Sequence, residues 1–435
     1  MQTLRSTARS MKALTPVLSS LSTSVKNAAL AAMAAAVRGQ ARELAEANQK
    51  DLDEAEVVGL EKPLLARLKF QGEKIEGAAE GLEALARLPD PVGRTLSARE
   101  LDRGLELYQV TCPLGVVAMI FESRPDALVQ MAGLALKSGN AVILKGGSEA
   151  KHSNRALADL LHRTAVKAGL PEGWLFLAET REDVKGLLEL GDFVDLIIPR
   201  GSNEFVQFIM KNTTIPVLGH ADGICHVYVD GNADIEKAVP IVVDSKTQYV
   251  AVCNAVETLL VHRDIAPFLL PPLRMALEAR AVQLRGDPET RKYLPGIAEA
   301  VEQDWETEYL DLILSIKVVG GVDEAVTHIN TYGSRHTDAI VTEDRATAEK
   351  FMGAVDSANV FWNASTRFAD GFRYGLGAEV GVSTSKIHAR GPVGLDGLVI
   401  YKWKLYGKGQ IVADYAGSNP KSFTHKELPN SGAAR

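Results

Sequence analysis

Cysteine is scarce in this sequence, and no long apolar segment occurs. The 435 residues include three cysteines, Cys112, Cys225 and Cys253, and no two of them have C-x-x-C spacing. An odd, sparse set excludes a disulfide framework and gives no zinc-binding pattern, so we expect no metal site. No apolar run approaches the roughly 18 residues that a membrane-spanning helix needs. We therefore expect no membrane association and a reducing compartment, the cytoplasm.

Massed positive charge is also absent. The formal net charge is -7 at pH 7, with Lys and Arg dispersed along the chain. Nucleic acids are bound by clustered basic side chains, so we expect no nucleic-acid partner. The start of the chain is the exception, because its first acidic residue is Glu43. A basic, acid-free start can be a transit peptide. Helical spacing of apolar residues from Leu30 to Val37, after a candidate N-cap at Ser24, favours a first helical part of the domain instead.

The first 90 residues are predicted to be helical. Amphipathic periodicity covers residues 24–58 and resumes over residues 61–88. The pattern is broken at Pro89-Asp-Pro91. We expect these helices to cover a sheet.

Strands and helices then alternate along the chain. Strand-like runs occupy residues 113–121, 141–145, 174–177 and 194–198, and helical segments occupy residues 125–139, 149–169 and 181–190. This order predicts a doubly wound parallel sheet, which binds ligands at the carboxyl ends of its strands. Two of those ends, Lys145-Gly-Gly-Ser148 and Arg200-Gly-Ser-Asn203, suit a nucleotide with phosphates. The alternative for Lys145 is a solvated strand end. No G-x-G-x-x-G fingerprint is present, so we do not expect an ordinary Rossmann dehydrogenase.

A second α/β region follows. Its expected strands are residues 227–229, 256–261, 312–319, 339–341 and 359–362. Residues 365–397 contain seven glycines and little periodicity. A glycine-rich loop of this length is more often functional than idle. Two further segments, residues 101–110 and 398–405, alternate like half-exposed strands and could pair and project from the body.

Cys253 is the candidate nucleophile. It lies between an amphipathic segment and the strand-like residues 256–261, and its small neighbours Ala251 and Ala255 leave room for a ligand beside the sulfur. A thiolate attacks a carbonyl carbon far better than a hydroxyl does. The alternative is that this cysteine is buried merely as a small hydrophobe.

Several segments, in one order along the chain, carry a resemblance to a known family. They include Phe121-Glu-Ser-Arg-Pro-Asp126, Lys145-Gly-Gly-Ser-Glu149, Ile198-Pro-Arg-Gly-Ser202, Cys253-Asn-Ala-Val-Glu-Thr-Leu-Leu-Val-His262 and Gly375-Leu-Gly-Ala-Glu-Val-Gly381. The chain resembles the aldehyde dehydrogenase superfamily, and within it most closely the gamma-glutamyl phosphate reductases. The resemblance extends over most of the chain.

The resemblance implies an aldehyde dehydrogenase-like α/β fold in three parts. An NADP-binding domain with the doubly wound sheet would comprise residues 1–99 and 113–226. An α/β catalytic domain with the nucleophilic cysteine would comprise residues 227–395. A small β oligomerisation flap and a tail would comprise residues 100–112 and 396–435, which implies a homo-oligomer.

The reaction implied by the resemblance is the NADPH-dependent reduction of L-glutamyl 5-phosphate to L-glutamate 5-semialdehyde and phosphate, in proline biosynthesis. Cys253 would form a thioacyl intermediate. Glutamate 5-kinase, which would make the unstable acyl phosphate, is a candidate partner. Two alternatives stay open: another cysteine-dependent semialdehyde dehydrogenase, for example a CoA-acylating one, and a non-catalytic scaffold relative.

The resemblance also assigns residues to the cofactor. Lys145 would meet the adenosine ribose or its 2′-phosphate. Ser148 stands about where NAD-preferring relatives carry a carboxylate, which favours NADPH. Gly201 and Ser202 open a helix and would face the pyrophosphate. Glu308 matches the residue that binds the nicotinamide ribose, and an exposed strand-edge carboxylate is its alternative.

Catalytic and substrate contacts follow from the same resemblance. Ser123 would stabilise the oxyanion together with the backbone N–H of Cys253. Asn363 would line the site, and a buried asparagine capping a strand end is the alternative. Arg124 would hold the substrate phosphate through a bidentate contact, and a surface pair with Glu122 is its alternative.

One departure from the superfamily supports a reductase. Its hydrolytic members carry a glutamate that activates water in the segment matching residues 214–226, and this chain has none there. A thioester would then meet hydride rather than water. His220 and Asp222 stand in its place, His220 as a substrate contact or both as a hydrogen-bonded loop. In the glycine-rich loop, Glu379 and Ser383 would hold the amino and carboxylate ends of the substrate.

Overall fold

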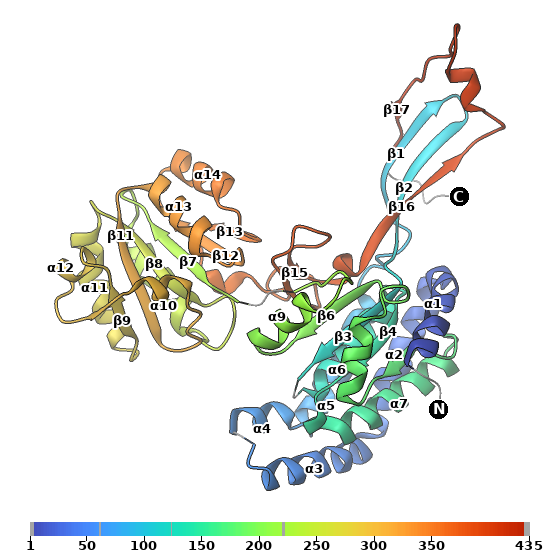
Figure 1. The fold of residues 1–435 in the computed structure, drawn as a ribbon, viewed down its shortest axis with the longest axis horizontal. Coiled ribbons are helices and arrows are strands. Elements are labelled where there is room, and N and C mark those ends of the chain that lie inside the picture. The colour runs from blue at the N-terminus through green and yellow to red at the C-terminus, as the bar shows by residue number, and fades with distance from the viewer. Residues whose placement is uncertain (1–3, 61, 123, 220–221, 430–435) are drawn as a thin grey trace. The chain divides into compact units, whose positions relative to one another are not determined.

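The computed structural model describes residues 4–60, 62–122, 124–219 and 222–429. The chain forms two compact units (Figure 1). The first unit comprises Met1–Gly201, Gln207–Leu218 and Gly394–Arg435, and the second comprises Ser202–Val206 and Gly219–Val393. No helix within the described ranges is long and apolar enough to span a bilayer.

The first unit contains the predicted doubly wound sheet. Its four strands are parallel and lie in the order β5 (Leu175–Leu177), β4 (Ala141–Lys145), β3 (Val116–Phe121) and β6 (Leu196–Arg200). Every residue of β3 and β4 is buried, as expected for apolar parallel strands with helices on both faces. The prediction of this sheet is confirmed.

Helices α1 (Leu4–Ser20), α6 (Pro125–Lys137) and α7 (Lys151–Lys167) pack directly on strands of the sheet. Outside them lies a further helical layer, formed by α2 (Thr23–Gly39), α3 (Ala41–Val57), α4 (Lys62–Leu68) and α5 (Glu73–Arg87), and α8 (Arg181–Leu188) packs on α1. Helix α9 (Asn203–Lys211) is divided between the two units. The helix predicted over residues 125–139 is α6, which begins with a proline and is followed by Gly139 at φ +72°. The N-cap of α2 is Ser22, not Ser24, since the Ser22 hydroxyl accepts the N–H of Val25 at 3.4 Å. The long helix predicted from Ser24 breaks after Gly39, where a glycine weakens helix propagation.

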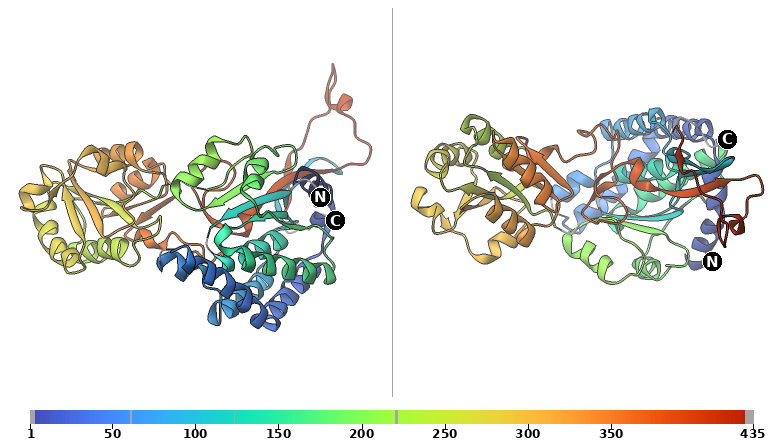
Figure 2. Two further views of the ribbon diagram at one scale, coloured as in Figure 1. Left: turned by 60° about the horizontal axis from the view of Figure 1, so that its bottom comes forward. Right: turned by 90° about the horizontal axis from the view of Figure 1, so that it is seen from above.

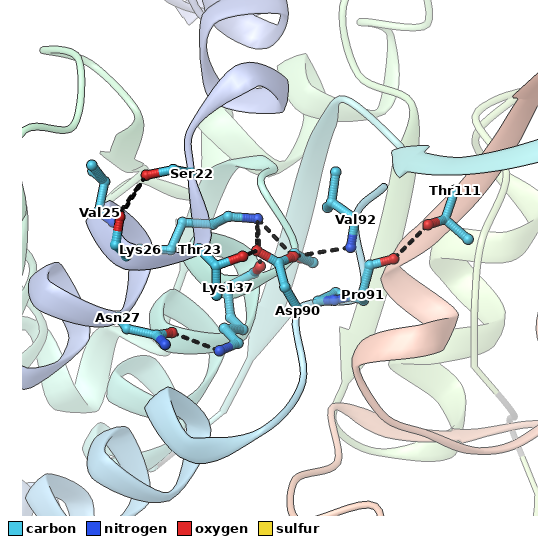
Figure 3. A network of polar contacts seen from close by, with 12 residues as sticks. Ser22, Thr23, Val25, Lys26, Asn27, Asp90, Pro91, Val92, Thr111 and Lys137 are labelled. Carbon is cyan, nitrogen blue, oxygen red and sulfur yellow. Dashed lines mark hydrogen bonds and ion pairs between the residues drawn. The ribbon is translucent and has the colours of Figure 1, made fainter. Parts of the chain in front are cut away.

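A buried polar network joins α2 to the chain that enters the antiparallel sheet (Figure 3). The ammonium of Lys26 is 1% exposed and pairs with Asp90 at 2.7 Å. Asp90 also accepts the N–H of Val92 at 2.9 Å. Lys137 donates to Asn27 at 2.6 Å, and burial lowers the pKa of Lys137. Lys26 is therefore paired with a carboxylate, whereas the buried ammonium of Lys137 is held by the side-chain oxygen of Asn27 and the carbonyl oxygen of Ala86.

The first unit also carries an antiparallel four-stranded sheet, which we call the flap. Its order is β16 (Val399–Tyr406), β2 (Leu105–Pro113), β1 (Thr95–Asp102) and β17 (Lys426–Glu427). β2 and β16 pair along their length, from Pro113 opposite Val399 to Glu106 opposite Tyr406, so the predicted pairing is confirmed. Strand β1 was not predicted, because its charged residues obscure the alternation. It forms a hairpin with β2 that turns at Gly104, whose φ is +73°.

The second unit is built on a parallel sheet. Its order is β10 (Ala298–Glu299), β9 (Gln283–Gly286), β11 (Ile313–Val319), β8 (Val256–His262), β7 (Cys225–Val229), β12 (Thr337–Val341) and β13 (Asn359–Trp362). One apolar core packs α10 (Ile235–Thr247) and α11 (Ala266–Glu278) on one face of the sheet. Another packs α13 (Val322–Tyr332) and α14 (Arg345–Ala354) on the opposite face, as both views in Figure 2 show.

Some short elements of the second unit carried no sequence signal. Strands β9 and β10 were not predicted, because two to four residues are too few to show a period. The short helix α12 (Thr290–Tyr293) lies between them in the sequence. Within the glycine-rich segment, β14 (Gly381–Ser383) and β15 (Gly391–Val393) form an antiparallel pair.

Candidate active site

Cys253 lies in the loop between α10 and β8 of the second unit. Its thiol is free and half-buried. Gly223, in the loop before β7, packs against the backbone of Cys253. A Cβ added to Gly223 would lie 2.2 Å from the carbonyl oxygen of Cys253. Because β7 and β8 are parallel neighbours, both loops lie at the amino-terminal edge of the sheet.

The other cysteine of this unit has a different environment. Cys225 begins β7, is completely buried, and its thiol donates to the carbonyl oxygen of Cys253 at 3.1 Å. Burial, reinforced by the charge of Asp338, raises the pKa of the Cys225 thiol well above its ordinary value. A thiol of this kind is a poor nucleophile, so Cys253 stays the candidate nucleophile of the second unit.

Glu308 reaches the same edge of the sheet. It lies in the loop before β11, which pairs directly with β8 on the side opposite β7. The amide Nδ2 of Asn203 donates to Glu308 at 2.7 Å and to Asp222 at 2.8 Å. Asp222 adjoins Gly223, so one amide connects the loop of Glu308 with the loop that packs on Cys253. Asn203 closes the predicted strand end Arg200-Gly-Ser-Asn203, but no sequence pattern indicated its contact with Glu308.

A buried ion pair connects the elements on either side of the nucleophile. Lys246 of α10 and Glu257 of β8 lie 2.6 Å apart, and both side chains are completely buried. The second carboxylate oxygen of Glu257 accepts the N–H of Leu310, two residues after Glu308, at 3.4 Å. Burial raises the pKa of Glu257 to about 7 and lowers that of Lys246. A glutamate within an otherwise apolar strand was the sequence signal for this pair.

Comparison with known proteins identifies the family. The aldehyde dehydrogenase family model matches residues 5–296. A gamma-glutamyl phosphate reductase from Pelotomaculum thermopropionicum is 61% identical, over 97% of this chain and 96% of the relative. The chain belongs to the gamma-glutamyl phosphate reductase branch of the aldehyde dehydrogenase family. It is therefore an oxidoreductase, and the predicted fold class is confirmed.

Two solved structures agree with this family. The crystal structure of a gamma-glutamyl phosphate reductase from Thermotoga maritima matches with a TM-score of 0.92 at 39% identity, covering 94% of this chain and 99% of that chain. An acetylating aldehyde dehydrogenase from Geobacillus thermoglucosidasius matches with a TM-score of 0.63 at 19% identity, covering 94% of this chain and 97% of that chain. The second likeness shows the fold alone.

Aldehyde dehydrogenases use a nicotinamide cofactor, and the end of β4 in the first unit fits one. Lys145 is buried there, and its ammonium donates to the carbonyl oxygen of Gly146 at 2.5 Å. A Cβ on Gly146 would lie 2.1 Å from the amide nitrogen of Asn154. The buried Oδ1 of Asn154 has no hydrogen-bond partner among the described residues. The free Oδ1 of Asn154 could accept from a ribose hydroxyl. The ammonium of Lys145 and the side-chain-free backbone at Gly146 suit a phosphate.

The other predicted cofactor residues lie at exposed strand ends. Ser148 is exposed, and the neighbouring Glu149 folds its carboxylate over Gly147, where a Cβ would lie 2.0 Å from Oε1. Gly201 follows β6 in the first unit. Ser202 precedes α9, and its hydroxyl accepts the N–H of Phe205 at 3.4 Å, as a helix-opening residue does.

Three further residues were predicted to contact the substrate or the oxyanion, and the structure describes one of them. Ser123 and His220 lie outside the described residues, so their roles stay predictions. Arg124 is exposed and is the N-cap residue of α6 in the first unit.

Asn363 lies at the opposite edge of its sheet from Cys253. It follows β13, next to the carboxyl end of β12, whereas Cys253 precedes β8. Its Oδ1 accepts the N–H of Thr342 and its Nδ2 donates to the carbonyl oxygen of Thr342, both at 3.0 Å. Its φ is +52°. These contacts favour the alternative role, a strand-end cap, over a place in the active site.

The glycine-rich segment packs on the loop near Cys253. The N–H of Thr384 contacts the carbonyl oxygen of Gly219 at 3.5 Å. Glu379 accepts the N–H of Gly371 at 2.6 Å. Ser383 is completely buried, and its hydroxyl accepts the N–H of Ser385 at 3.2 Å. Both predicted substrate residues therefore have structural partners within their own segment, and their binding roles stay predictions.

Proposed function

We propose that this chain reduces L-glutamyl 5-phosphate with NADPH to L-glutamate 5-semialdehyde and phosphate, in proline biosynthesis. The observation that carries the proposal is the half-buried Cys253, held beside the loop of Glu308 in a chain 61% identical to a gamma-glutamyl phosphate reductase. The activity of that relative supports the substrate.

Cys253 performs the covalent step. Its thiolate attacks the acyl carbon, a carbon–sulfur bond forms, and the carbon–oxygen bond to phosphate breaks. The backbone N–H of Cys253 donates to the oxyanion. When bound, a nicotinamide cofactor would supply the hydride, and Glu308 would hold its ribose. Cys253 is released as thiolate when the aldehyde leaves, which divides one difficult step into two easier ones.

The loop on Cys253 supports reduction over hydrolysis. Residues 214–226 contain no glutamate, and their carboxylate, Asp222, already accepts the amide of Asn203 at 2.8 Å. This hydrogen bond holds the carboxylate of Asp222 against Asn203. The thioester therefore survives until hydride arrives.

The reaction run backwards tests the function. Glutamate semialdehyde, NADP and phosphate are supplied, and formation of NADPH is followed by absorbance. We expect turnover that requires phosphate and is lost in Cys253→Ala but retained in Cys112→Ala, the matched control on the flap. Turnover with CoA in place of phosphate would favour a CoA-acylating enzyme instead, and unchanged turnover in Cys253→Ala would exclude the thioacyl route.

NADPH is the proposed cofactor because position 148 has no carboxylate. Ser148→Glu should move the preference toward NADH, since a carboxylate repels the 2′-phosphate. Glu149→Gln is the matched variant, because Glu149 carries the nearest carboxylate along the chain. The wild type could instead prefer NADH, and Glu149→Gln could reverse that preference. This result would show that Glu149, not position 148, discriminates between NADH and NADPH.

The remaining assignments are parts of the same proposal. Residues 1–99 and 113–226 bind the cofactor, residues 227–395 carry catalysis, and the flap with the tail joins subunits of a homo-oligomer. Glutamate 5-kinase is the proposed partner, because it would deliver the unstable acyl phosphate directly. The cytoplasm is the proposed location, because the catalytic thiol needs a reducing compartment.

A further inference from the structure

A buried arginine near the nucleophile has no counter-charge. Arg367 lies in the short 3₁₀ helix η3 (Thr366–Phe368) and is only 8% exposed. Its Nε donates to the side-chain oxygen of Gln248 at 3.0 Å. Its two terminal nitrogens have no hydrogen-bond or ion-pair partner within the described ranges. A charge this buried is unfavourable unless an anion pairs with it.

The segment that carries Arg367 is fastened to the loop of Cys253. The hydroxyl of Thr366 donates to the carbonyl oxygen of Asn254 at 2.7 Å. The amide of Asn254 donates in turn to the carbonyl oxygen of Ala369 at 2.9 Å. Hydrogen bonds on both sides of Arg367 thus join it to the residue that follows the nucleophile.

Other charged groups near Arg367 do not neutralise it. Asp370 pairs with Arg373 at 3.6 Å, and Asp244 is exposed on α10. Burial and then Arg373 lower the pKa of Arg367, while Cys253, Asp370 and Asp244 act in the opposite direction. A guanidinium stays protonated in proteins, so its open donors remain available to an anion.

We propose that Arg367 binds an oxyanion of the substrate that reacts at Cys253. This inference rests on the function proposed above, whose substrate offers two such groups, the α-carboxylate and the acyl phosphate. The planar fork of a guanidinium matches either one through two hydrogen bonds. Gln248 orients the fork by holding Nε, which leaves both terminal nitrogens for the ligand.

Kinetics of the reverse reaction distinguish the two anions, because phosphate and semialdehyde are then separate substrates. In Arg367→Met, we expect the KM of one of them to rise about 10- to 100-fold, as for the loss of hydrogen bonds to a charged group. Arg367→Lys should restore part of the affinity. The substrate whose KM rises is the ligand of Arg367. The control is Arg345→Met, an exposed arginine on α14 of the same unit.

Binding measured without turnover separates this site from the proposed function. Thermal unfolding is followed with inorganic phosphate or L-glutamate as the probe. We expect one probe to raise the Tm of the wild type but not of Arg367→Met. Without a probe, Arg367→Met should be at least as stable as the wild type, because it removes an unpaired buried charge.

One outcome would overturn the anion site at Arg367, and a different outcome would overturn the proposed reductase activity. Arg367→Met with unchanged KM values and a lower Tm without probe would show a purely structural arginine. Wild-type chain that binds a probe through Arg367 but gives no phosphate-dependent turnover would defeat the proposed function and leave the anion site standing.

Discussion

At the scale of single residues, Gly223 governs where the nucleophile lies. A Cβ on this residue would lie 2.2 Å from the carbonyl oxygen and 2.4 Å from the Cα of Cys253, closer than real Cβ atoms approach. Gly223→Ala must therefore displace the loop of Cys253. We expect activity to fall about 100-fold, as for a displacement of about 1 Å at a reacting group. Steady-state kinetics measure the change, and circular dichroism checks that the fold is kept.

The matched control is another glycine with free space around it. Gly77 lies in α5, is exposed, and a Cβ there would meet nothing within 4 Å. Gly77→Ala should leave activity unchanged and add about 0.5–1 kcal/mol of stability, since alanine favours a helix. Equal activity in the two glycine variants would contradict the positioning role of Gly223.

At the scale of elements, the pair of Lys246 and Glu257 holds α10 and β8 around the loop of Cys253. Removing one partner leaves the other charge buried without compensation. We expect Lys246→Met or Glu257→Leu alone to destabilise the chain by about 3–5 kcal/mol. The double variant should lose much less than the sum. Urea unfolding of the four chains measures the coupling.

An exposed ion pair between a lysine of the same helix and the loop after β12 is the control for that cycle. Lys237 and Glu343 lie 2.9 Å apart, and both are about half exposed. Water and salt screen this pair, so its coupling should be small. A buried pair that couples no more strongly than this one would show that burial does not make Lys246 and Glu257 interdependent.

At the scale of the whole molecule, a buried histidine makes stability depend on pH. Burial, and then the charges of His226 and Lys317, lower the pKa of His328 from 6.5 to about 3. Between pH 6.5 and about pH 3, His328 is therefore protonated in the unfolded chain but not in the folded chain. The contribution of His328 to stability should fall as the pH drops below about 6.5, by up to about 1.4 kcal/mol per unit. The raised pKa of Glu257 acts in the opposite direction between about 4.5 and 7, so the two contributions are separated by comparing variants. Urea midpoints between pH 7 and pH 5 measure the slope.

Replacement of the histidine tests that origin. His328→Gln should make the chain lose less stability, relative to the wild type, when the pH is lowered from 7 to 5, because glutamine does not titrate. His425→Gln, an exposed residue near β17, should leave the slope as in the wild type. An unaltered slope in His328→Gln would assign the acid sensitivity to other groups.

The flap makes a prediction about assembly. Tyr401, Trp403 and Leu405 alternate along β16 and are 45%, 56% and 56% exposed. An exposed apolar row on an edge strand usually marks a protein–protein contact. Trp403→Lys should therefore reduce the mass of the particle in light scattering. Phe268→Lys, on the exposed side of α11, should not. Equal particle masses for Trp403→Lys and the wild type would show that the flap does not form the contact between subunits.

Local patterns predicted the elements but not all of their neighbours. Buried strands β3 and β4 and the proline that begins α6 were predicted because apolar runs and backbone chemistry act over a few residues. The charged strand β1 and the short strands β9 and β10 were missed, because they show no clear period. Pairing of β2 with β16 was predicted only because both strands alternate strongly.

The sequence alone therefore determined the α/β fold class, the doubly wound sheet and Cys253 as the candidate nucleophile. Only the tertiary structure decided which polar groups meet: Arg367 with Gln248, 119 residues apart, and Asn203 with Glu308, 105 residues apart. It also placed Asn363 at the far edge of the sheet. The physical reason is that hydrophobic periodicity is set by neighbours along the chain. Contacts between polar groups depend instead on which strands and loops become neighbours when the chain folds.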